Sequence, residues 1–157
     1  MVGERQAVAR HLIVRGCTTD LLLAAALGDL TLVRRHLDDD ARPVRMRVDD
    51  HWFPKVNPKA GGTIYNWTLG FHASAHEVAK RYGHSDVLQL LFNRTPAAAR
   101  VVEACWIEDE DAVARFRQDV TDVNSALDQS DRTLVAHAAR NNKTMAVRLM
   151  LESGLPV

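Results

Sequence analysis

The chain has 157 residues, which fits a single domain with a sizeable core. Its 20 Lys and Arg balance 20 Asp and Glu, so no overall charge favours binding to nucleic acid or to a membrane surface. The longest apolar run, 21–27, is too short to span a bilayer, and the chain does not open on a secretory signal. Cys17 and Cys105 are its two cysteines, which fits a reducing compartment without disulfides. These features predict a cytoplasmic protein without a membrane partner.

Apolar residues recur at helical spacing along most of the chain, in pairs of short segments separated by a turn. A half unit opens the chain at 3–18. Four pairs follow, with turns centred on Gly28, Gly83, Glu108 and Asn142. Two helices of this length cannot bury their apolar faces alone, so each pair requires neighbours of the same form. The pattern therefore predicts a stack of helix pairs.

The turn positions are spaced in a way that favours one class of repeat. From position 3 through 28, 83 and 108 to 142, the intervals are 25, 55, 25 and 34 residues. A period of about 33 residues is typical of ankyrin repeats, each of which is a turn followed by two antiparallel helices. The 55-residue interval indicates an insertion of about 22 residues between two units.

Three stretches carry a specific resemblance to the ankyrin repeat family. L-L-L-A-A-A-L-G-D-L-T-L-V at 21–33 has that family's leucine, alanines, glycine turn and amphipathic second helix. S-A-H-E-V-A at 74–79 stands where the family usually has T-P-L-H-x-A, and G-L-P-V at 154–157 resembles its closing G-A-D-V. The resemblance to a divergent member implies an all-α, ankyrin-like helical repeat solenoid in one domain, 1–157. Its predicted parts are a half unit at 3–18, units at 19–42, 71–94, 95–120 and 130–157, and an extended finger at 43–70.

Local signals predict where individual helices begin. Ser74 and Glu77 have the spacing of a capping box, in which hydroxyl and carboxylate each accept a backbone N–H. Thr95 is expected to cap the helix that starts at Pro96, because proline fits the first helical position. Glu108 stands where a turn often needs positive φ, which glutamate disfavours, so this turn is expected to differ from the others.

The inserted finger, 43–70, is predicted to form a β-hairpin-like extension. Val44, Met46 and Val48 alternate with arginines, as in a half-buried strand. Residues 63–68 are rich in β-branched and aromatic types and form the second candidate strand. The prolines and glycines between the two candidates favour turns.

Four of the nine aromatic residues fall in the finger: Trp52, Phe53, Tyr65 and Trp67. One hypothesis is a small core that holds the finger against the neighbouring helices. The other is a recognition surface, because Trp and Tyr offer a large rigid contact area with a polar group. Ankyrin family members generally bind along fingers and first helices. The resemblance therefore implies a partner-binding site formed by Trp52, Phe53, Tyr65, Asn66 and Trp67, with Arg45 and Arg47 at its rim.

The histidines and cysteines that could bind a metal or act as nucleophiles are more simply explained as structural residues. His72, His76 and His84 lie close in sequence, but a metal site needs a third ligand of suitable spacing and a second shell. Cys105 with His137, or Cys17 with His11 or His36, are the candidate nucleophile pairs. Cys105 lies at a small-residue core position, where a thiol is inert. We therefore expect no catalysis, no bound metal and no cofactor.

The predicted function is a non-catalytic protein–protein interaction module with an unidentified protein partner, without binding to nucleic acid or membrane. A structural or regulatory segment of a larger polypeptide is the alternative, and a hydrolase or metalloprotein that uses the histidines is a third. The segment 144–151 is apolar nearly all round, which predicts an exposed patch at the C-terminal end. Such a patch indicates either a fragment of a longer array or self-association around Val147 and Met150.

Overall fold

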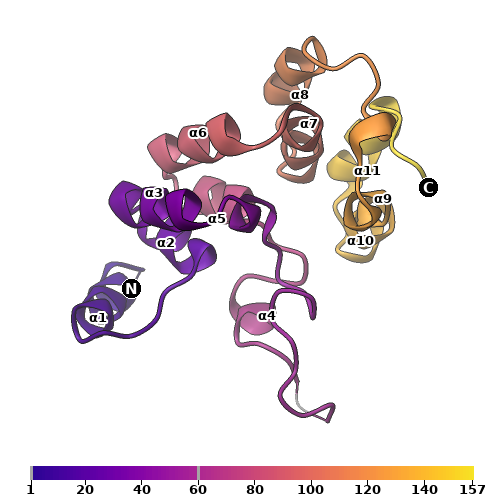
Figure 1. The fold of residues 1–157 in the computed structure, drawn as a ribbon. Coiled ribbons are helices and arrows are strands. Elements are labelled where there is room, and N and C mark those ends of the chain that lie inside the picture. The colour runs from indigo at the N-terminus through magenta and orange to yellow at the C-terminus, as the bar shows by residue number, and fades with distance from the viewer. Residues whose placement is uncertain (1, 60) are drawn as a thin grey trace.

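The computed structural model describes residues 2–59 and 61–157, so Ala60 of the predicted finger lies outside the described residues. Within these ranges the chain forms eleven α-helices, two short 3₁₀-helices (η1 and η2) and no β-strand, which confirms the all-α class (Figure 1). None of the helices in these two ranges has the length and apolarity needed to cross a bilayer. In chain order the elements are α1 (Val2–Val14), α2 (Leu21–Leu27), α3 (Leu30–Asp39), η1 (Arg42–Arg45), α4 (Tyr65–Thr68), α5 (Ala75–Arg81), α6 (Ser85–Arg94), α7 (Ala97–Trp106), α8 (Glu110–Arg117), η2 (Asn124–Ala126), α9 (Gln129–Arg132), α10 (Leu134–Arg140) and α11 (Thr144–Glu152).

The turns between paired helices share one backbone conformation. Gly28 and Gly83 have φ of 66° and 75°, and Glu108 and Asn142 both have φ of 57°. The prediction that the Glu108 turn differs is therefore wrong. The Glu108 carboxylate accepts the backbone N–H of Ala146, in the first turn of α11, at 3.4 Å. This bond satisfies a free helix-terminal donor and helps to offset the roughly 1–2 kcal/mol that the left-handed region costs.

Acidic and hydroxyl side chains begin several helices. Asp20, Asp29 and Asp109 each accept a backbone N–H three residues on, in the first turns of α2, α3 and α8. Ser74 does the same for α5, accepting from the N–H of Glu77 at 3.2 Å. The Glu77 carboxylate does not complete the predicted capping box, because it bonds to side chains of other elements.

The joint between α6 and α7 differs from its prediction at both Thr95 and Pro96, because α7 begins at Ala97. Pro96 immediately precedes α7 and Thr95 ends α6, so Thr95 does not cap the following helix. Its hydroxyl instead donates to the carbonyl of Leu91, one turn back in α6, at 2.7 Å. The buried Thr95 hydroxyl is thus bonded to the last turn of α6 rather than to the start of α7.

Cationic and polar side chains from neighbouring pairs satisfy the carbonyls at the ends of α2 and α7. Arg10 of α1 donates to the carbonyl of Leu27, and a ring nitrogen of His84 lies 3.2 Å from the carbonyl of Ala26. At the end of α7, Lys80 of α5 donates to the carbonyl of Ile107 and Lys143 to that of Trp106. These contacts satisfy groups that helix geometry leaves free and place positive charge at the negative end of each helix.

The apolar interior consists of two clusters rather than one. The N-terminal cluster is formed by α2, α3, α5 and α6 with the base of the finger, and includes Leu22, Val33 and Leu91. The C-terminal cluster is formed by α7, α8, α10 and α11 with Phe92 of α6, and includes Trp106 and Met150. Polar contacts connect α5 to α7 at the joint between the two clusters.

The finger contains helical turns instead of a β-hairpin, so that part of the prediction is wrong. Pro43 lies in the first turn of the 3₁₀-helix η1, whose last bond runs from the N–H of Met46 to the Pro43 carbonyl. Arg47 forms an isolated antiparallel bridge with Ser74, and the second candidate strand is the helical turn α4. Val44, Met46, Arg47 and Val48 are all buried, so this segment lacks the one-sided burial on which the strand prediction depended.

The glycine at the α2–α3 turn permits a close contact between helix pairs. A Cβ added at Gly28 would lie 2.6 Å from Nδ1 of His84, whereas one at Gly83 meets nothing within 4 Å. Gly83→Ala is therefore expected to cost about 1–2 kcal/mol from backbone strain alone. Gly28→Ala should cost about 1 kcal/mol more, because His84 must move and lose its bond to Ala26. Urea denaturation of the two variants measures the difference, and equal losses would contradict the role given to His84.

The C-terminal end is less exposed than its sequence suggests. Met150 is fully buried in the C-terminal cluster and Val147 is half-buried against it. Met145 and Leu151 are the large apolar residues of α11 that face solvent, with 39% and 45% of their surface exposed. The contact role predicted for Met150 is therefore wrong, because that side chain cannot reach a partner, and self-association of this helix stays a prediction.

Candidate functional site

Three of the finger aromatics form a small core, as the first hypothesis for them predicts. Trp52, Phe53 and Tyr65 are half-buried and pack against the N-terminal cluster. The rings of Phe53 and Tyr65 meet edge to face with centroids 5.3 Å apart. The Tyr65 hydroxyl donates to Asp20 at 2.9 Å, and burial raises the pKa of this phenol. These contacts hold the finger against the start of α2.

Trp67 is placed differently from the other aromatics of the finger. It has 77% of its surface exposed on α4, next to Ile64 with 67% exposed. Asn66 is half-buried, and its amide donates to the carbonyl of Gly61 at 3.5 Å. We call Ile64, Trp67 and Phe71, which is 51% exposed just beyond the finger, the exposed finger residues. In Figure 1 the finger projects from the helices beside α5, and α4 lies along it.

Arg45 and Arg47, the expected rim residues, both serve structural contacts. Arg47 is buried, and its guanidinium lies 2.5 Å from a carboxylate oxygen of Glu103 in α7. Arg45 reaches the last helices instead, where it pairs with Asp128 at 2.9 Å and with Asp131. Arg47 therefore cannot contact a partner, and Arg45 can do so only through its exposed part.

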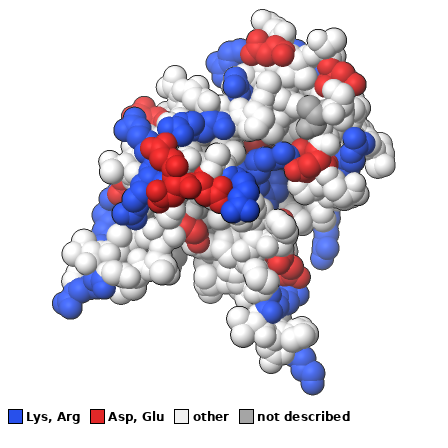
Figure 2. Space-filling model, viewed as in Figure 1, with Lys and Arg blue, Asp and Glu red and all other residues white. Residues whose placement is uncertain are grey.

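A recess of about 640 Å³ lies between the base of the finger and α9. It is lined by Arg42, Arg45, Arg47, Asp49, His51, Trp52, Asp128, Gln129 and Ser130. Each of its arginines already pairs with a carboxylate, because Arg42 forms an ion pair with Asp40 in addition to the pairs of Arg45 and Arg47. Basic and acidic side chains are likewise interspersed on the face drawn in Figure 2. The recess therefore offers little uncompensated charge for an anionic ligand.

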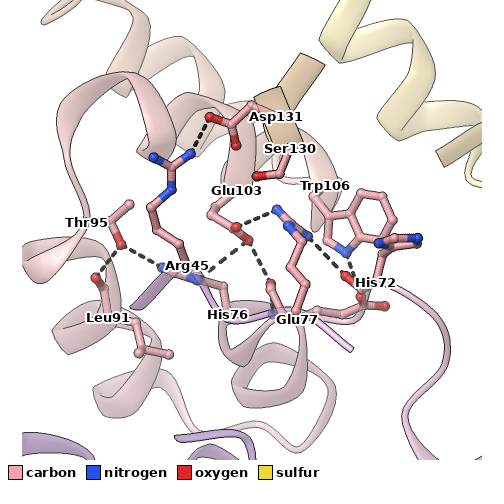
Figure 3. A network of polar contacts seen from close by, with 12 residues as sticks. Arg45, His72, His76, Glu77, Leu91, Thr95, Glu103, Trp106, Ser130 and Asp131 are labelled. Carbon is pink, nitrogen blue, oxygen red and sulfur yellow. Dashed lines mark hydrogen bonds and ion pairs between the residues drawn. The ribbon is translucent and has the colours of Figure 1, made fainter. Parts of the chain in front are cut away.

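Glu103 is the centre of a buried polar network at the joint between the two clusters (Figure 3). One carboxylate oxygen accepts from Arg47 at 2.5 Å and the other from the Ser74 hydroxyl at 2.7 Å. Arg47 also donates to the carbonyl of His72 at 3.0 Å, so one guanidinium connects the finger base with α7. The ion pair is buried on both sides, with 7% and 6% of the side-chain surface exposed.

His76 completes this network from α5 and is fully buried. The single hydroxyl hydrogen of Thr95 goes to the carbonyl of Leu91, so Nε2 of His76 donates to the Thr95 oxygen at 3.0 Å. Burial lowers the pKa of His76, and the nearby Glu103 only partly opposes this. The ring is thus neutral, and its Nδ1 lies 3.6 Å from Glu103 without a hydrogen-bond partner.

A second set of polar contacts surrounds Trp106, the largest fully buried side chain. Its indole N–H donates to Glu77 at 2.7 Å, and Glu77 also pairs with Lys143 at 3.2 Å and Arg81 at 3.0 Å. The guanidinium of Arg47 lies 4.9 Å from the centre of the indole and the ammonium of Lys143 5.1 Å from it. The joint is therefore held by one indole, two carboxylates and the cations that neutralise them.

The residues considered for chemistry are separated by the fold. His76 bonds to Thr95, His84 to Ala26, and His72 stacks on His137 with ring centroids 3.6 Å apart. Within residues 2–59 and 61–157, no group of three His, Cys, Asp or Glu side chains is placed to hold a metal. Cys105 contacts Ser153, and burial raises the pKa of its thiol to about 11, which disfavours the nucleophilic thiolate. Ser74, His76 and Glu103 are buried together, but His76 bonds to Thr95 rather than activating the serine.

Sequence reasoning missed Glu103, the residue on which most of the joint depends. The available signal was one carboxylate inside an otherwise apolar helix, V-V-E-A-C-W at 101–106. A buried charge requires a partner of opposite sign, but sequence could not identify Arg47, which lies 56 positions away. A comparison of the chain with protein-family models, with curated proteins and with solved structures finds no match to any of the three.

Proposed function

We propose that the chain is a non-catalytic, ankyrin-like protein-binding module that captures its partner through the exposed finger residues Ile64, Trp67 and Phe71. The observation that carries the proposal is Trp67, a residue that is 77% exposed on a segment whose other aromatics are packed. An exposed tryptophan beside other apolar side chains is typical of the centre of a binding site, where a few aromatic residues supply most of the affinity.

The arrangement of the helices supports the comparison with ankyrin repeats. Four helix pairs turn through a residue with positive φ, and side chains of adjacent pairs satisfy the last carbonyls of α2 and α7. The half-buried aromatics Phe53 and Tyr65 give the finger a firm base. A rigid base lowers the entropy that the finger loses on binding, which favours affinity.

Trp67→Ala tests the proposal directly. Because Trp67 is exposed, the change should alter the free energy of unfolding by no more than about 0.5 kcal/mol. If it is a central contact, binding should weaken by about 2 kcal/mol, or roughly thirty-fold. The measurement is quantitative mass spectrometry of proteins retained from cell extract by the immobilised chain, followed by titration of the main retained protein.

Two variants make this experiment decisive. Val8→Ala removes a comparably exposed apolar side chain from α1, far from the finger in sequence, and should leave the retained proteins unchanged. Tyr65→Phe removes the bond to Asp20 without exposing the finger further, and should affect stability before binding. If Trp67→Ala retains the same partner with unchanged affinity, the exposed finger residues are not the binding site.

A further inference from the structure

Residues of the finger and the segment just after it meet α9 and α10 along a polar seam. His72 stacks on His137, with ring centroids 3.6 Å apart and planes 28° apart. The amide of Asn141 donates to the carbonyl of Phe71 at 3.3 Å, and the guanidinium of Arg140 lies 6.0 Å from the Phe71 ring. At the other end of the seam, Arg45 pairs with Asp128 and Asp131.

The seam lies outside both apolar clusters. The finger base contributes Val44, Val48 and Leu69 to the N-terminal cluster, whereas α10 contributes Leu134 and Ala138 to the C-terminal one. The contacts that join finger and α10 are therefore aromatic and polar. Such a seam is sensitive to ionisation of its side chains. When one of them becomes charged, no apolar packing between the finger and α10 keeps the seam closed.

Hydrogen bonds hold the backbone of His72 on both sides. His72 has φ of 61°, which is uncommon outside glycine, and its N–H donates to the carbonyl of Val48 at 2.9 Å. Its own carbonyl accepts from the buried Arg47 at 3.0 Å. With both backbone groups bonded, His72 cannot relieve a repulsion by a local backbone change while the seam remains closed.

Two histidine rings at this distance cannot both be in the cationic form, with both ring nitrogens protonated, without strong repulsion. The ionisable groups around them are Arg47 and Asp49 from the finger base and Arg140 from α10, two cations against one anion. Burial, followed by His137 and then Arg47, lowers the pKa of His72 to about 4. Burial and then Arg140 also lower the pKa of His137. Protonation of either ring is therefore disfavoured while the seam is closed.

We propose that the His72–His137 pair is an acid-sensitive latch, which holds the finger against α10 at neutral pH and releases it in mildly acidic solution. The direction follows from proton linkage. A histidine whose pKa is lowered in the closed form binds protons more readily in the open form. Closure is fully favoured above the ordinary histidine pKa of about 6.5, and becomes less favoured as pH falls from there towards the lowered value.

Hydrogen exchange of the whole chain tests the latch at about pH 7.5 and about pH 5. The amides of His72 and of 137–141 are compared with those of α7, so that the intrinsic pH dependence of exchange cancels. The seam amides should exchange roughly tenfold faster relative to α7 at the lower pH, while far-UV circular dichroism stays unchanged. An unchanged ratio would overturn the latch.

Variants separate the histidines from the carboxylates of the seam. His72→Asn keeps a residue that tolerates positive φ, and His137→Phe keeps a ring for stacking. The double variant should lose the acid response, and the exposed His11→Phe should retain it. A tenfold response that persists in the double variant would assign release to protonation of the seam carboxylates, Asp128 and Asp131, and the latch would be wrong. If the double variant does not fold, nuclear magnetic resonance titration of His72 in the unaltered chain decides, since a midpoint at or above the ordinary value also excludes the latch.

Discussion

Glu103→Ala is expected to lower the free energy of unfolding by about 3–5 kcal/mol, because it leaves the buried guanidinium of Arg47 without its counter-charge. The same change leaves the Ser74 hydroxyl without its acceptor. Domains of this kind are stable by only about 5–15 kcal/mol, so the loss is a large fraction of the total. Urea denaturation followed by far-UV circular dichroism measures it.

Two further variants distinguish a lost ion pair from a general loss of packing. Arg42→Ala removes an exposed arginine whose ion pair with Asp40 is solvent-screened, and its denaturation midpoint should not change measurably. Replacing both members of the buried pair, Arg47→Met with Glu103→Leu, should recover much of the stability lost in Glu103→Ala. If the double replacement is as unstable as Glu103→Ala, the uncompensated charge is not the cause.

Trp106→Ala is expected to cost about 3–5 kcal/mol, since it removes the largest fully buried side chain and leaves a cavity at the joint. It also removes the indole that bonds to Glu77 and lies beneath Arg47 and Lys143. The denaturant slope should stay constant if the chain still unfolds in one step. Separate transitions for the two clusters would show that the joint is what couples them.

Trp106→Phe is the matched control for the cavity. It keeps an aromatic ring at the same position but removes the N–H that Glu77 accepts. Its cost should be clearly smaller than that of Trp106→Ala and should reflect a lost bond to a charged acceptor, about 1.5–3 kcal/mol. A cost equal to that of alanine would mean that the indole hydrogen bond, rather than volume, stabilises the joint.

Both predictions concern the same feature, a joint between two apolar clusters at which charged side chains and one indole meet. Apolar packing is non-directional, whereas an ion pair with fixed hydrogen bonds defines one arrangement of the two halves. Removing one partner is costly because the remaining charge stays buried. The finger depends on this joint, because Arg47 lies at its base.

Sequence determined the helices and their turns, because both depend on neighbouring residues. Apolar spacing located most of the helices, and the turns at Gly28 and Gly83 have the positive φ that glycine permits. Asp109 caps α8 by accepting the N–H of Ala112, a bond between residues three apart in sequence. These features follow from periodicity and local hydrogen bonds, which neighbouring residues supply.

Only the tertiary structure decided the form of the finger and the roles of its residues. The alternation of Val44, Met46 and Val48 predicted a strand, but burial of Arg47, between the last two, removed its physical basis. The four aromatics are alike in sequence, yet Tyr65 reaches Asp20 while Trp67 faces solvent. The ion pair of Arg47 with Glu103 and the stack of His72 on His137 join residues more than 50 positions apart. Such contacts depend on how the helix pairs stack, and local sequence does not contain that information.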